Sequence, residues 1–238
     1  MDKFKERTSI IVGDQGLDKL DKASVIVFGL GGVGSYVVEA LARSGIGRLT
    51  LVDFDTVDIT NINRQIPALH STIGCKKVDI ISARVKDINP NIKVIAHAQL
   101  YDKTTSDQLL DGDFDYVIDA IDMLKPKLHL IETCYKRGLK IISSMGMGNK
   151  LDPCQIEISD IHKTQMCPLA KIIRKEAKER GIKKLTVIYS KEKPSKPRLI
   201  QKDSKSEMVN GSISFVPSAG GLIIASYVVR DILGLLEK

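Results

Sequence analysis

Along the first part of the chain, short apolar runs alternate with longer segments in which apolar positions recur every three or four residues. Short runs are typical of buried strands, and the wider spacing is typical of helices that pack on one face. Strands are expected at residues 24–28, 49–52, 93–98, 116–119 and 139–143. Helices are expected at residues 35–44, 74–88, 106–110 and 126–137.

After residue 146 the pattern becomes less regular. Residues 155–159 alternate like an edge strand, and Pro168 suits the first turn of an amphipathic helix at 168–180. A strand is expected at 185–189 and a closing helix at 218–236. The remaining segments are an amino-terminal arm at 1–23 with a short helix at 16–20, an irregular stretch at 56–71, and a charged, mobile loop at 191–207.

Strands that alternate with helices favour a parallel sheet covered by helices on both faces. We therefore expect an α/β fold with a doubly wound, mainly parallel, Rossmann-like sheet. Residues 1–150 form this core with its arm, and residues 151–238 add an α+β region packed on the same domain. In such sheets the ligand lies beyond the carboxyl ends of the strands.

The net charge of +7 is unevenly distributed along the chain. Residues 171–205 contain thirteen Lys and Arg against four Asp and Glu, a local balance of +9 that exceeds the charge of the whole chain. A localised basic region indicates a polyanionic partner, with nucleic acid the leading candidate. A solvated helix face followed by a loop is the alternative.

Other features bear on location and metal content. The amino terminus lacks the apolar core of a signal peptide, and the longest apolar run, residues 220–229, ends at Arg230. We interpret this run as a core helix and expect no stable membrane insertion. The four cysteines form no CxxC pair, so no zinc is expected, and free thiols fit a cytoplasmic location.

The first predicted strand is followed at once by the glycine-rich turn Gly-Leu-Gly-Gly-Val-Gly at residues 29–34. In a strand–turn–helix unit these glycines allow a tight turn, the approach of a phosphate, and close packing of the helix. The helix amides then face the phosphate. Asp53 ends the second strand, where it can accept a ribose hydroxyl. The predicted adenine-nucleotide site therefore includes Gly29, Gly31, Gly32, Gly34 and Asp53.

Two cations and three acids help to choose between a dinucleotide-dependent hydride-transfer enzyme and an ATP-using adenylating enzyme. Arg64 and Lys77 suit negative charge on an α-phosphate under attack and on departing pyrophosphate. Asp119 and Asp122, at the mouth of the fourth strand, could hold magnesium on the phosphates. Asp55 could orient Arg64 or the metal. Each residue alone could be a surface charge or a turn cap, but together they favour adenylation.

Two other interpretations remain. A protein that senses an adenine nucleotide without chemistry would have Arg64 and Lys77 far from the phosphates. A hydride-transfer enzyme is the weakest reading, because the sequence shows no Ser, His or Tyr constellation for it and its histidines are isolated.

These motifs, as an ordered set, resemble the family of ubiquitin-activating and MoeB/ThiF/HesA-type adenylating enzymes over residues 7–150. The matching segments are residues 29–34, 53–55, 60–65, 74–77 and 119–122. The resemblance implies that Asp53 binds ribose, that Asn61, Arg64 and Lys77 surround the triphosphate, and that Asp122 ligates magnesium. Gln65 and Asp119, within the same motifs, complete the expected nucleotide site together with Asp55.

Arg7 and Cys167 are two further candidate residues that the family pattern suggests. An arginine in the amino-terminal arm of the family reaches into the ATP site of the partner subunit, and Arg7 matches it. Thr8 follows Arg7 where the family usually has an aromatic residue. Cys167 precedes a predicted helix start that could lower its pKa. A structural role is the simpler reading of this cysteine.

The carboxyl-terminal third resembles one subgroup, the tRNA threonylcarbamoyladenosine dehydratases, in residues 152–156, 163–164, 168–170 and 216–221. This resemblance implies ATP-dependent dehydration of threonylcarbamoyladenosine in tRNA through an acyl-adenylate. It also implies a homodimer, and a sulfur-relay protein is a further candidate partner. The basic region at 171–205 then becomes the expected tRNA contact. The alternative is an activator of a small ubiquitin-like sulfur-carrier protein, with Cys167 as acceptor.

Overall fold

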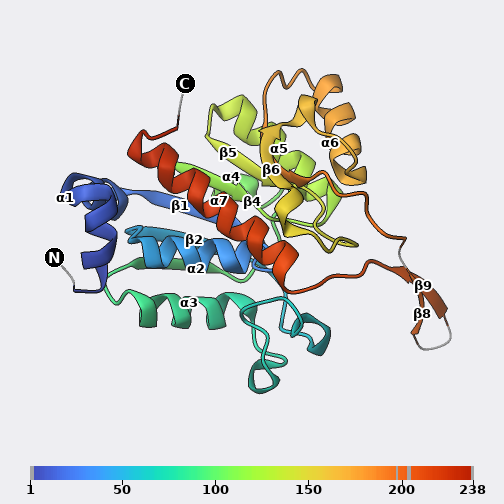
Figure 1. The fold of residues 1–238 in the computed structure, drawn as a ribbon, viewed down its shortest axis with the longest axis horizontal. Coiled ribbons are helices and arrows are strands. Elements are labelled where there is room, and N and C mark those ends of the chain that lie inside the picture. Colours follow the sequence, from blue (N-terminus) through green and yellow to red (C-terminus); the bar gives the residue numbers. More distant parts are fainter. Residues whose placement is uncertain (1–2, 197, 203–204, 237–238) are drawn as a thin grey trace.

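The computed structural model describes residues 3–196, 198–202 and 205–236. Its centre is a seven-stranded sheet with the order β3-β2-β1-β4-β5-β7-β6 (Figure 1). Every strand runs parallel to its neighbours except β6, which pairs antiparallel with β7 at one edge. The strands are β1 (Ser24–Phe28), β2 (Arg48–Val52), β3 (Lys93–His97), β4 (Tyr116–Asp119), β5 (Ile141–Ser144), β6 (Ile156–Asp160) and β7 (Thr186–Ser190).

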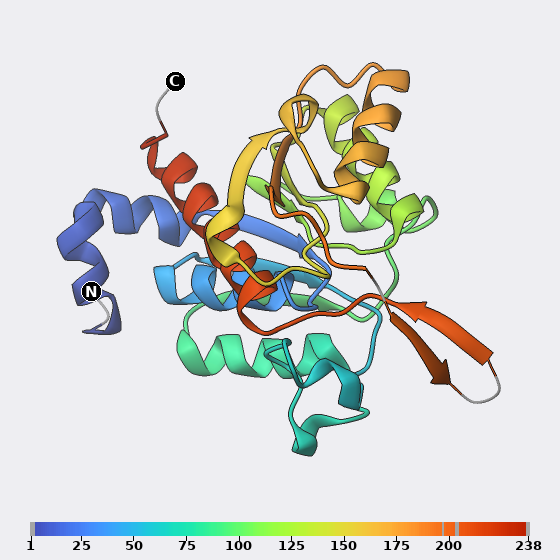
Figure 2. The same ribbon diagram turned by 45° about the vertical axis from the view of Figure 1, so that its right-hand side comes forward.

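Helices cover both faces of the sheet, as the sequence predicts (Figure 2). Along β1, Val25 and Val27 face a cluster with α2, α3 and α7, whereas Ile26 and Phe28 face a cluster with α4 and α5. This alternation follows from the two-residue period of a strand. The helices are α1 (Glu6–Lys22), α2 (Gly34–Ser44), α3 (Lys77–Ile88), α4 (Ser106–Leu109), α5 (Leu124–Arg137), α6 (Pro168–Glu179) and α7 (Phe215–Leu233). The doubly wound, mainly parallel fold class is confirmed.

Two segments differ from the sequence-based expectation. Helix α1 is much longer than the short helix expected at residues 16–20, and it contains a kink at Gly13, whose φ is +71°. The segment at 191–207, expected to be a loop, contributes to a two-stranded hairpin of β8 (Arg198–Lys202) and β9 (Lys205–Val209). Two prolines and many charges concealed these short strands in the sequence pattern.

The carboxyl-terminal helix α7 packs closely on α2. A Cβ atom at Gly221 would lie 2.5 Å from the Val33 carbonyl oxygen, so this approach requires glycine. By length and composition alone α7 could span a membrane. In this fold, however, Val216, Ile224 and Val228 on α7 are fully buried in the main core. The expectation of a core helix at 220–229 agrees with this packing. The domain boundary at residue 150 stays a prediction.

Candidate functional site

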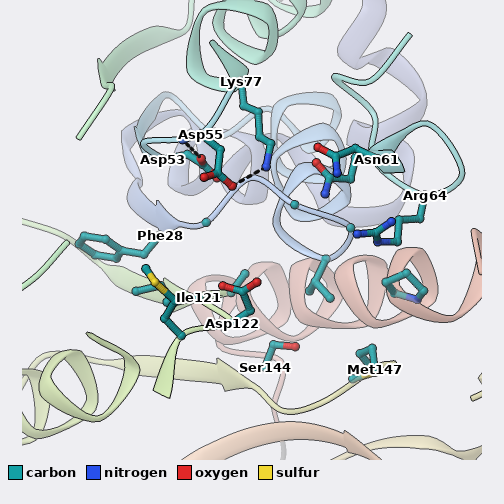
Figure 3. Close-up of a pocket in the computed structure, with 18 of the residues that line it drawn as sticks. Phe28, Asp53, Asp55, Asn61, Arg64, Lys77, Ile121, Asp122, Ser144 and Met147 are labelled. Atoms are coloured by element: carbon teal, nitrogen blue, oxygen red, sulfur yellow. Dashed lines mark hydrogen bonds and ion pairs between the residues drawn. The ribbon is translucent and has the colours of Figure 1, made fainter. Parts of the chain in front are cut away.

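A cavity of about 730 Å³ opens at the carboxyl ends of β1, β2, β4 and β5 (Figure 3). Its volume is in the range typical of small-molecule and cofactor sites. The walls come from the glycine turn after β1, the end of β2, and the loop before α3. The loops after β4 and β5 and the segment leading into α7 complete them. A parallel sheet is expected to bind its ligand at this place.

The glycine turn has the geometry that the motif predicts. Gly29 has a φ of +89°, and a Cβ atom there would lie 2.6 Å from the Ala120 carbonyl oxygen. A Cβ atom at Gly34 would lie 1.8 Å from the Gly29 carbonyl oxygen, so the first residue of α2 must be glycine. Gly31 and Gly32 line the cavity. Gly34 frames the turn from behind rather than lining the cavity, and the amino end of α2 is directed at the ligand space.

Asp53 lies at the end of β2 and is largely buried. Its Oδ2 accepts a hydrogen bond from the Leu30 backbone N–H at 2.6 Å, and its Oδ1 accepts one from the Asp55 N–H at 2.8 Å. Burial raises the pKa of Asp53 above its usual value, although the bond from Leu30 and the charge of Lys77 oppose that rise. An ionised carboxylate can accept about four hydrogen bonds, so capacity remains for a ribose.

Two cations lie on the cavity wall with different partners. The Lys77 ammonium is 2.7 Å from Asp55 Oδ2, and the Lys77 side chain is only 5% exposed. The Arg64 guanidinium donates to the Thr60 carbonyl oxygen at 2.9 Å and to Asn63 Oδ1 at 2.7 Å. Asp55 therefore orients Lys77 rather than Arg64. Figure 3 shows Lys77, Asp55 and Asp53 grouped together, with Arg64 beside Asn61 at the neighbouring wall.

Asn61 and Gln65 lie in the irregular segment between β2 and α3, and Asn61 ends a short 3-10 helix at Ile59–Asn61. Asn61 closes a capping box with Asp58, which fixes the turn at the cavity. Gln65 is buried, and its Oε1 has no hydrogen-bond partner among the described residues. Buried polar atoms are normally hydrogen-bonded, so this oxygen is suited to a donor from a bound ligand.

The two acids after β4 occupy different environments. Asp119 is fully buried, and its Oδ2 accepts from Lys127 Nζ at 2.7 Å and from Ser143 Oγ at 2.6 Å. It does not line the cavity. Asp122, three residues further on, is exposed and lines the cavity across from Lys77 (Figure 3). The paired acids expected at the mouth of β4 are therefore one buried ion-pair partner and one cavity residue.

No group of three or more His, Cys, Asp or Glu side chains is gathered for a metal within residues 3–196, 198–202 and 205–236. Magnesium commonly binds one or two carboxylates and completes its shell with phosphates and water. A single carboxylate such as that of Asp122 is enough for such a shell when a nucleotide supplies the phosphates. The four cysteines are free thiols, and Cys167 is buried in an apolar cluster with α6. The expectation of no zinc stays a prediction.

Arg7 lies on α1, is exposed, and does not line the cavity of its own chain. In both ribbon views α1 lies at the opposite end of the molecule from the β8–β9 hairpin (Figures 1 and 2). The sequence assigns Arg7 to the site of a partner subunit, and that role stays a prediction.

Several cavity residues carry no signal in the sequence. Residues 144–148, from the last residue of β5 onward, line one side of the cavity. Asn210, Gly211 and Ser212 line the wall next to the hairpin. The Gly146-Met147-Gly148 stretch marks a change of pattern but no chemistry. Asn63 belongs to the motif at residues 60–65, but the sequence gives it no role of its own. In the structure it hydrogen-bonds both Arg64 and Ser212.

The basic region divides into two elements. On α6, Lys171 and Lys178 are exposed and make no ion pair among the described residues. Arg174 instead donates to the Thr164 carbonyl oxygen and hydroxyl at 2.6 and 2.8 Å, and Lys175 is 3.7 Å from Glu179. The rest of the region leads into the hairpin, where residues 197, 203 and 204 lie outside the described residues.

A glycine turn, a carboxylate at the end of β2 and two cations around one cavity define a nucleotide-binding α/β protein with the charges of an adenylating enzyme. The sequence matches the ThiF family over residues 6–238, and the chain belongs to that family. It is 46% identical to a tRNA threonylcarbamoyladenosine dehydratase of Bacillus subtilis, over 97% of this chain and 95% of the relative. The Escherichia coli dehydratase is 38% identical over 74% of this chain and 67% of the relative.

Solved structures agree with these relationships. The Escherichia coli enzyme TcdA in complex with ATP superposes with a TM-score of 0.89 and 30% identity, covering 98% of this chain and 96% of that one. Its complex with AMP also gives a TM-score of 0.89, at 31% identity. The adenylyltransferase and sulfurtransferase MOCS3 of Aedes aegypti is 34% identical, but over only 57% of this chain and 31% of its own length.

Proposed function

We propose that this protein dehydrates threonylcarbamoyladenosine in tRNA, using ATP and forming an acyl-adenylate. One observation carries the proposal. A chain that aligns almost end to end with a Bacillus subtilis dehydratase places Arg64, Lys77, Asp53 and the glycine turn around a single cavity. The alignment with that relative covers 97% of this chain and so includes the carboxyl-terminal part, whereas the MOCS3 relative aligns with only 57% of this chain.

The chemistry balances without a nucleophile from the protein. A carboxylate oxygen of the modified nucleoside attacks the α-phosphorus of ATP, the bond to the bridging oxygen breaks, and pyrophosphate leaves with the electron pair. A nucleophile within the same nucleoside then attacks the activated carbonyl carbon and loses its proton. AMP departs with one former carboxylate oxygen, so the nucleoside loses the elements of water. Because the second nucleophile is already held in place, the ring closes without an enzyme thioester.

The side chains of the cavity have separate roles in this proposal. Asp53 accepts ribose hydroxyls, and Asn61 and Gln65 hold the nucleotide from the turn before α3. Lys77 and Arg64 stabilise charge on the α-phosphate and on departing pyrophosphate. Asp122 is the residue that would hold magnesium, which when bound neutralises charge on the phosphates. Asp119 acts indirectly, because its ion pair with Lys127 fixes the end of β4 from which the Asp122 loop begins.

The tRNA contact is assigned to exposed lysines of α6 and to the basic approach to the hairpin. Lys171 and Lys178 on α6 are exposed, as are Lys193 and Lys196 before β8, and none of the four makes an ion pair with another residue that the structure describes. Contacts to phosphates would give affinity that depends on salt and little on sequence.

We further infer a homodimer in which Arg7 serves the site of the other subunit. Arg7 cannot act at a cavity that it does not line, and the same helix exposes Ile10 and Ile11 to 83% and 85%. Two adjacent and almost fully exposed isoleucines suit an interface, and a second copy of this chain is the partner that the family resemblance implies. A cytoplasmic location, where thiols stay free, belongs to the same proposal. A sulfur-relay partner rests on the resemblance alone.

The deciding experiment is AMP release from ATP and magnesium by the purified protein, with tRNA that carries or lacks threonylcarbamoyladenosine. Wild type should form AMP only with the modified tRNA, and the digested nucleoside should lose one water by mass. Arg64→Ala should bind ATP yet turn over at least about a hundredfold more slowly, because charge stabilisation of the transition state is lost.

The same experiment distinguishes the alternative activity. Pyrophosphate exchange that depends on a small carrier protein, with no reaction on tRNA, would identify an activator of sulfur carriers. Cys167 is only 3% exposed, which does not favour its role as an acceptor.

A further inference from the structure

The β8–β9 hairpin leaves the body of the protein between Ser195 and Gly211, and Asn149 ties both points to the cavity wall. Asn149 directly follows Gly148, which lines the cavity. The Asn149 N–H donates to the Gly211 carbonyl oxygen at 2.8 Å, and the Ser195 N–H donates to the Asn149 carbonyl oxygen at 2.7 Å. Asn149 Oδ1 accepts from the Gly211 N–H at 2.6 Å, and its Nδ2 donates to Asn210 Oδ1 at 2.8 Å.

The local backbone is adapted to this junction. Asn149 has a φ of +59°, a left-handed conformation that is uncommon outside glycine and costs less for asparagine than for most residues. A Cβ atom at Gly148 would lie 3.2 Å from the Gly211 carbonyl oxygen, so the glycine before Asn149 relieves crowding between the two segments. The hydrogen bonds around Asn149 therefore hold an uncommon backbone conformation next to the cavity.

A second link continues from the hairpin base to a proposed catalytic cation. The Ser212 carbonyl oxygen accepts a hydrogen bond from Asn63 Nδ2 at 2.9 Å. Asn63 Oδ1 in turn accepts from the Arg64 guanidinium at 2.7 Å. Because residues 210–212 line the cavity, the hairpin base and Arg64 are joined by consecutive hydrogen bonds along one wall.

We propose that Asn149 is a positioning residue that couples RNA held at the base of the hairpin, around Lys193 and Lys196, to the geometry of the nucleotide cavity. This inference rests on the proposed function for its RNA substrate. RNA contacts reach the hairpin through the basic approach at Lys193 and Lys196, which are exposed. With Asn149 in place, the position of the hairpin sets the wall at 210–212 and, through Asn63, the Arg64 guanidinium. The modified nucleoside then reacts fastest when the rest of its tRNA also contacts the base of the hairpin.

Asn149→Gly tests this role, because glycine keeps the left-handed backbone and its main-chain bonds but removes both side-chain bonds. We expect kcat for AMP release on modified tRNA to fall roughly tenfold, while KM for ATP and for tRNA changes less than about twofold. Asn149→Asp retains an acceptor for the Gly211 N–H and should recover part of kcat. Met166→Gly is the matched control, because Met166 is the other described non-glycine residue with positive φ and makes no bond to the hairpin.

A raised KM for tRNA with an unchanged kcat would reduce Asn149 to an RNA-binding role and overturn the proposal. So would an unchanged kcat and KM together.

A second measurement separates this inference from the proposed reaction. Hydrogen exchange without tRNA should be faster around residues 195 and 211 in Asn149→Gly than in wild type, because the side-chain bonds that hold the base are gone. Adding ATP should slow exchange there in wild type only. If wild type shows this protection but no turnover, the coupling through Asn149 is supported and the proposed dehydratase activity is rejected. Exchange that is the same in both proteins would overturn the coupling, whatever the reaction proves to be.

Discussion

At the scale of single residues, the charges of the cavity are held in position by neighbouring groups. Lys77 is the first residue of α3, and its nearly buried ammonium is fixed by Asp55 at 2.7 Å. Removing a lysine from water is costly unless an acid compensates it, and here Asp55 does so from the partly open side. A cation that is already oriented needs little rearrangement when phosphate charge develops, which is the condition for strong electrostatic catalysis.

Asp53 leads to a prediction about pH. Burial raises its pKa, so the carboxyl group takes up a proton at a higher pH than an ordinary Asp does. The ionised form accepts the Leu30 N–H and the ribose hydroxyls more strongly, because protonation removes the charge and turns one carboxylate oxygen into a donor. The affinity for ATP should therefore fall as the pH is lowered through this raised pKa, by up to about tenfold per pH unit once the group is mostly protonated.

Isothermal titration with ATP across acidic pH measures this effect, and Asp53→Asn is the control that removes the Asp53 titration but leaves that of ATP. The variant should bind more weakly at neutral pH and lose the additional slope. Parallel pH profiles for the two proteins would show that Asp53 does not titrate with binding.

Sequence motifs placed Asp53, Arg64, Lys77 and Asp122 at one site, and all four line the cavity, although their roles stay predictions. Asp53 and Asp122 could be located because they follow β2 and β4, and Lys77 because it begins α3 at the same edge of the sheet. Arg64 lies in the irregular segment between β2 and α3, where only the motif indicated it. Asp119 could not be resolved in this way. Whether the last residue of β4 faces the ligand or the interior depends on Lys127, which reaches it from α5 and becomes fully buried. No local sequence pattern predicts the ion pair between Lys127 and Asp119.

At the scale of elements, α6 combines two kinds of basic residue that look alike in the sequence. Arg174 anchors the segment before the helix through Thr164, whereas Lys171 and Lys178 are exposed and have no ion-pair partner within the described part of the chain. The hairpin is a similar case, since β8 and β9 lie in a stretch whose charges and prolines indicate a loop. Helix periodicity gave the position of α6, but only tertiary contacts distinguish an anchoring cation from an available one.

This distinction predicts how α6 responds to charge reversal. Lys171→Glu with Lys178→Glu should weaken tRNA binding by roughly tenfold and make it less sensitive to salt, because two phosphate contacts are lost. ATP affinity should stay the same. Binding measured by fluorescence anisotropy at several salt concentrations gives both quantities.

Lys86→Glu with Lys93→Glu introduces the same charge change on α3 and β3, far from the proposed RNA surface. If this control weakens tRNA binding as much as the α6 pair does, the effect reflects net charge and α6 is not the contact. Equal loss of ATP and tRNA affinity in the α6 pair would likewise contradict separate surfaces.

At the scale of the whole molecule, the sheet order explains where the cavity lies. The chain crosses from β3 at one edge to β4 on the other side of β1, and the cavity opens at this reversal, as expected for a doubly wound sheet. This part of the fold was predictable from the alternation of strands and helices. The wall formed by residues 210–212 was not, because a segment far away in sequence is brought there by α7 packing on α2 and by the bonds around Asn149.

The same scale decides whether one chain makes a complete site. Arg7 is exposed on α1 at the end of the molecule away from the hairpin, and it does not line its own cavity. If Arg7 serves the partner in a symmetric dimer, then Arg7→Ala and Lys77→Ala should each be nearly inactive alone. Mixed and allowed to exchange subunits, they should recover about a quarter of wild-type activity, since half of the dimers are mixed and each mixed dimer has one intact site.

AMP release on modified tRNA measures this complementation, and sedimentation of each variant verifies that it still dimerises. A mixture of Arg64→Ala with Lys77→Ala is the control, because both residues line the cavity of one chain and no exchange can restore an intact site. If the Arg7 mixture stays as inactive as this control although subunits exchange, Arg7 does not act across the interface. Recovery in the Arg7 mixture alone would show that each active site is built from two chains.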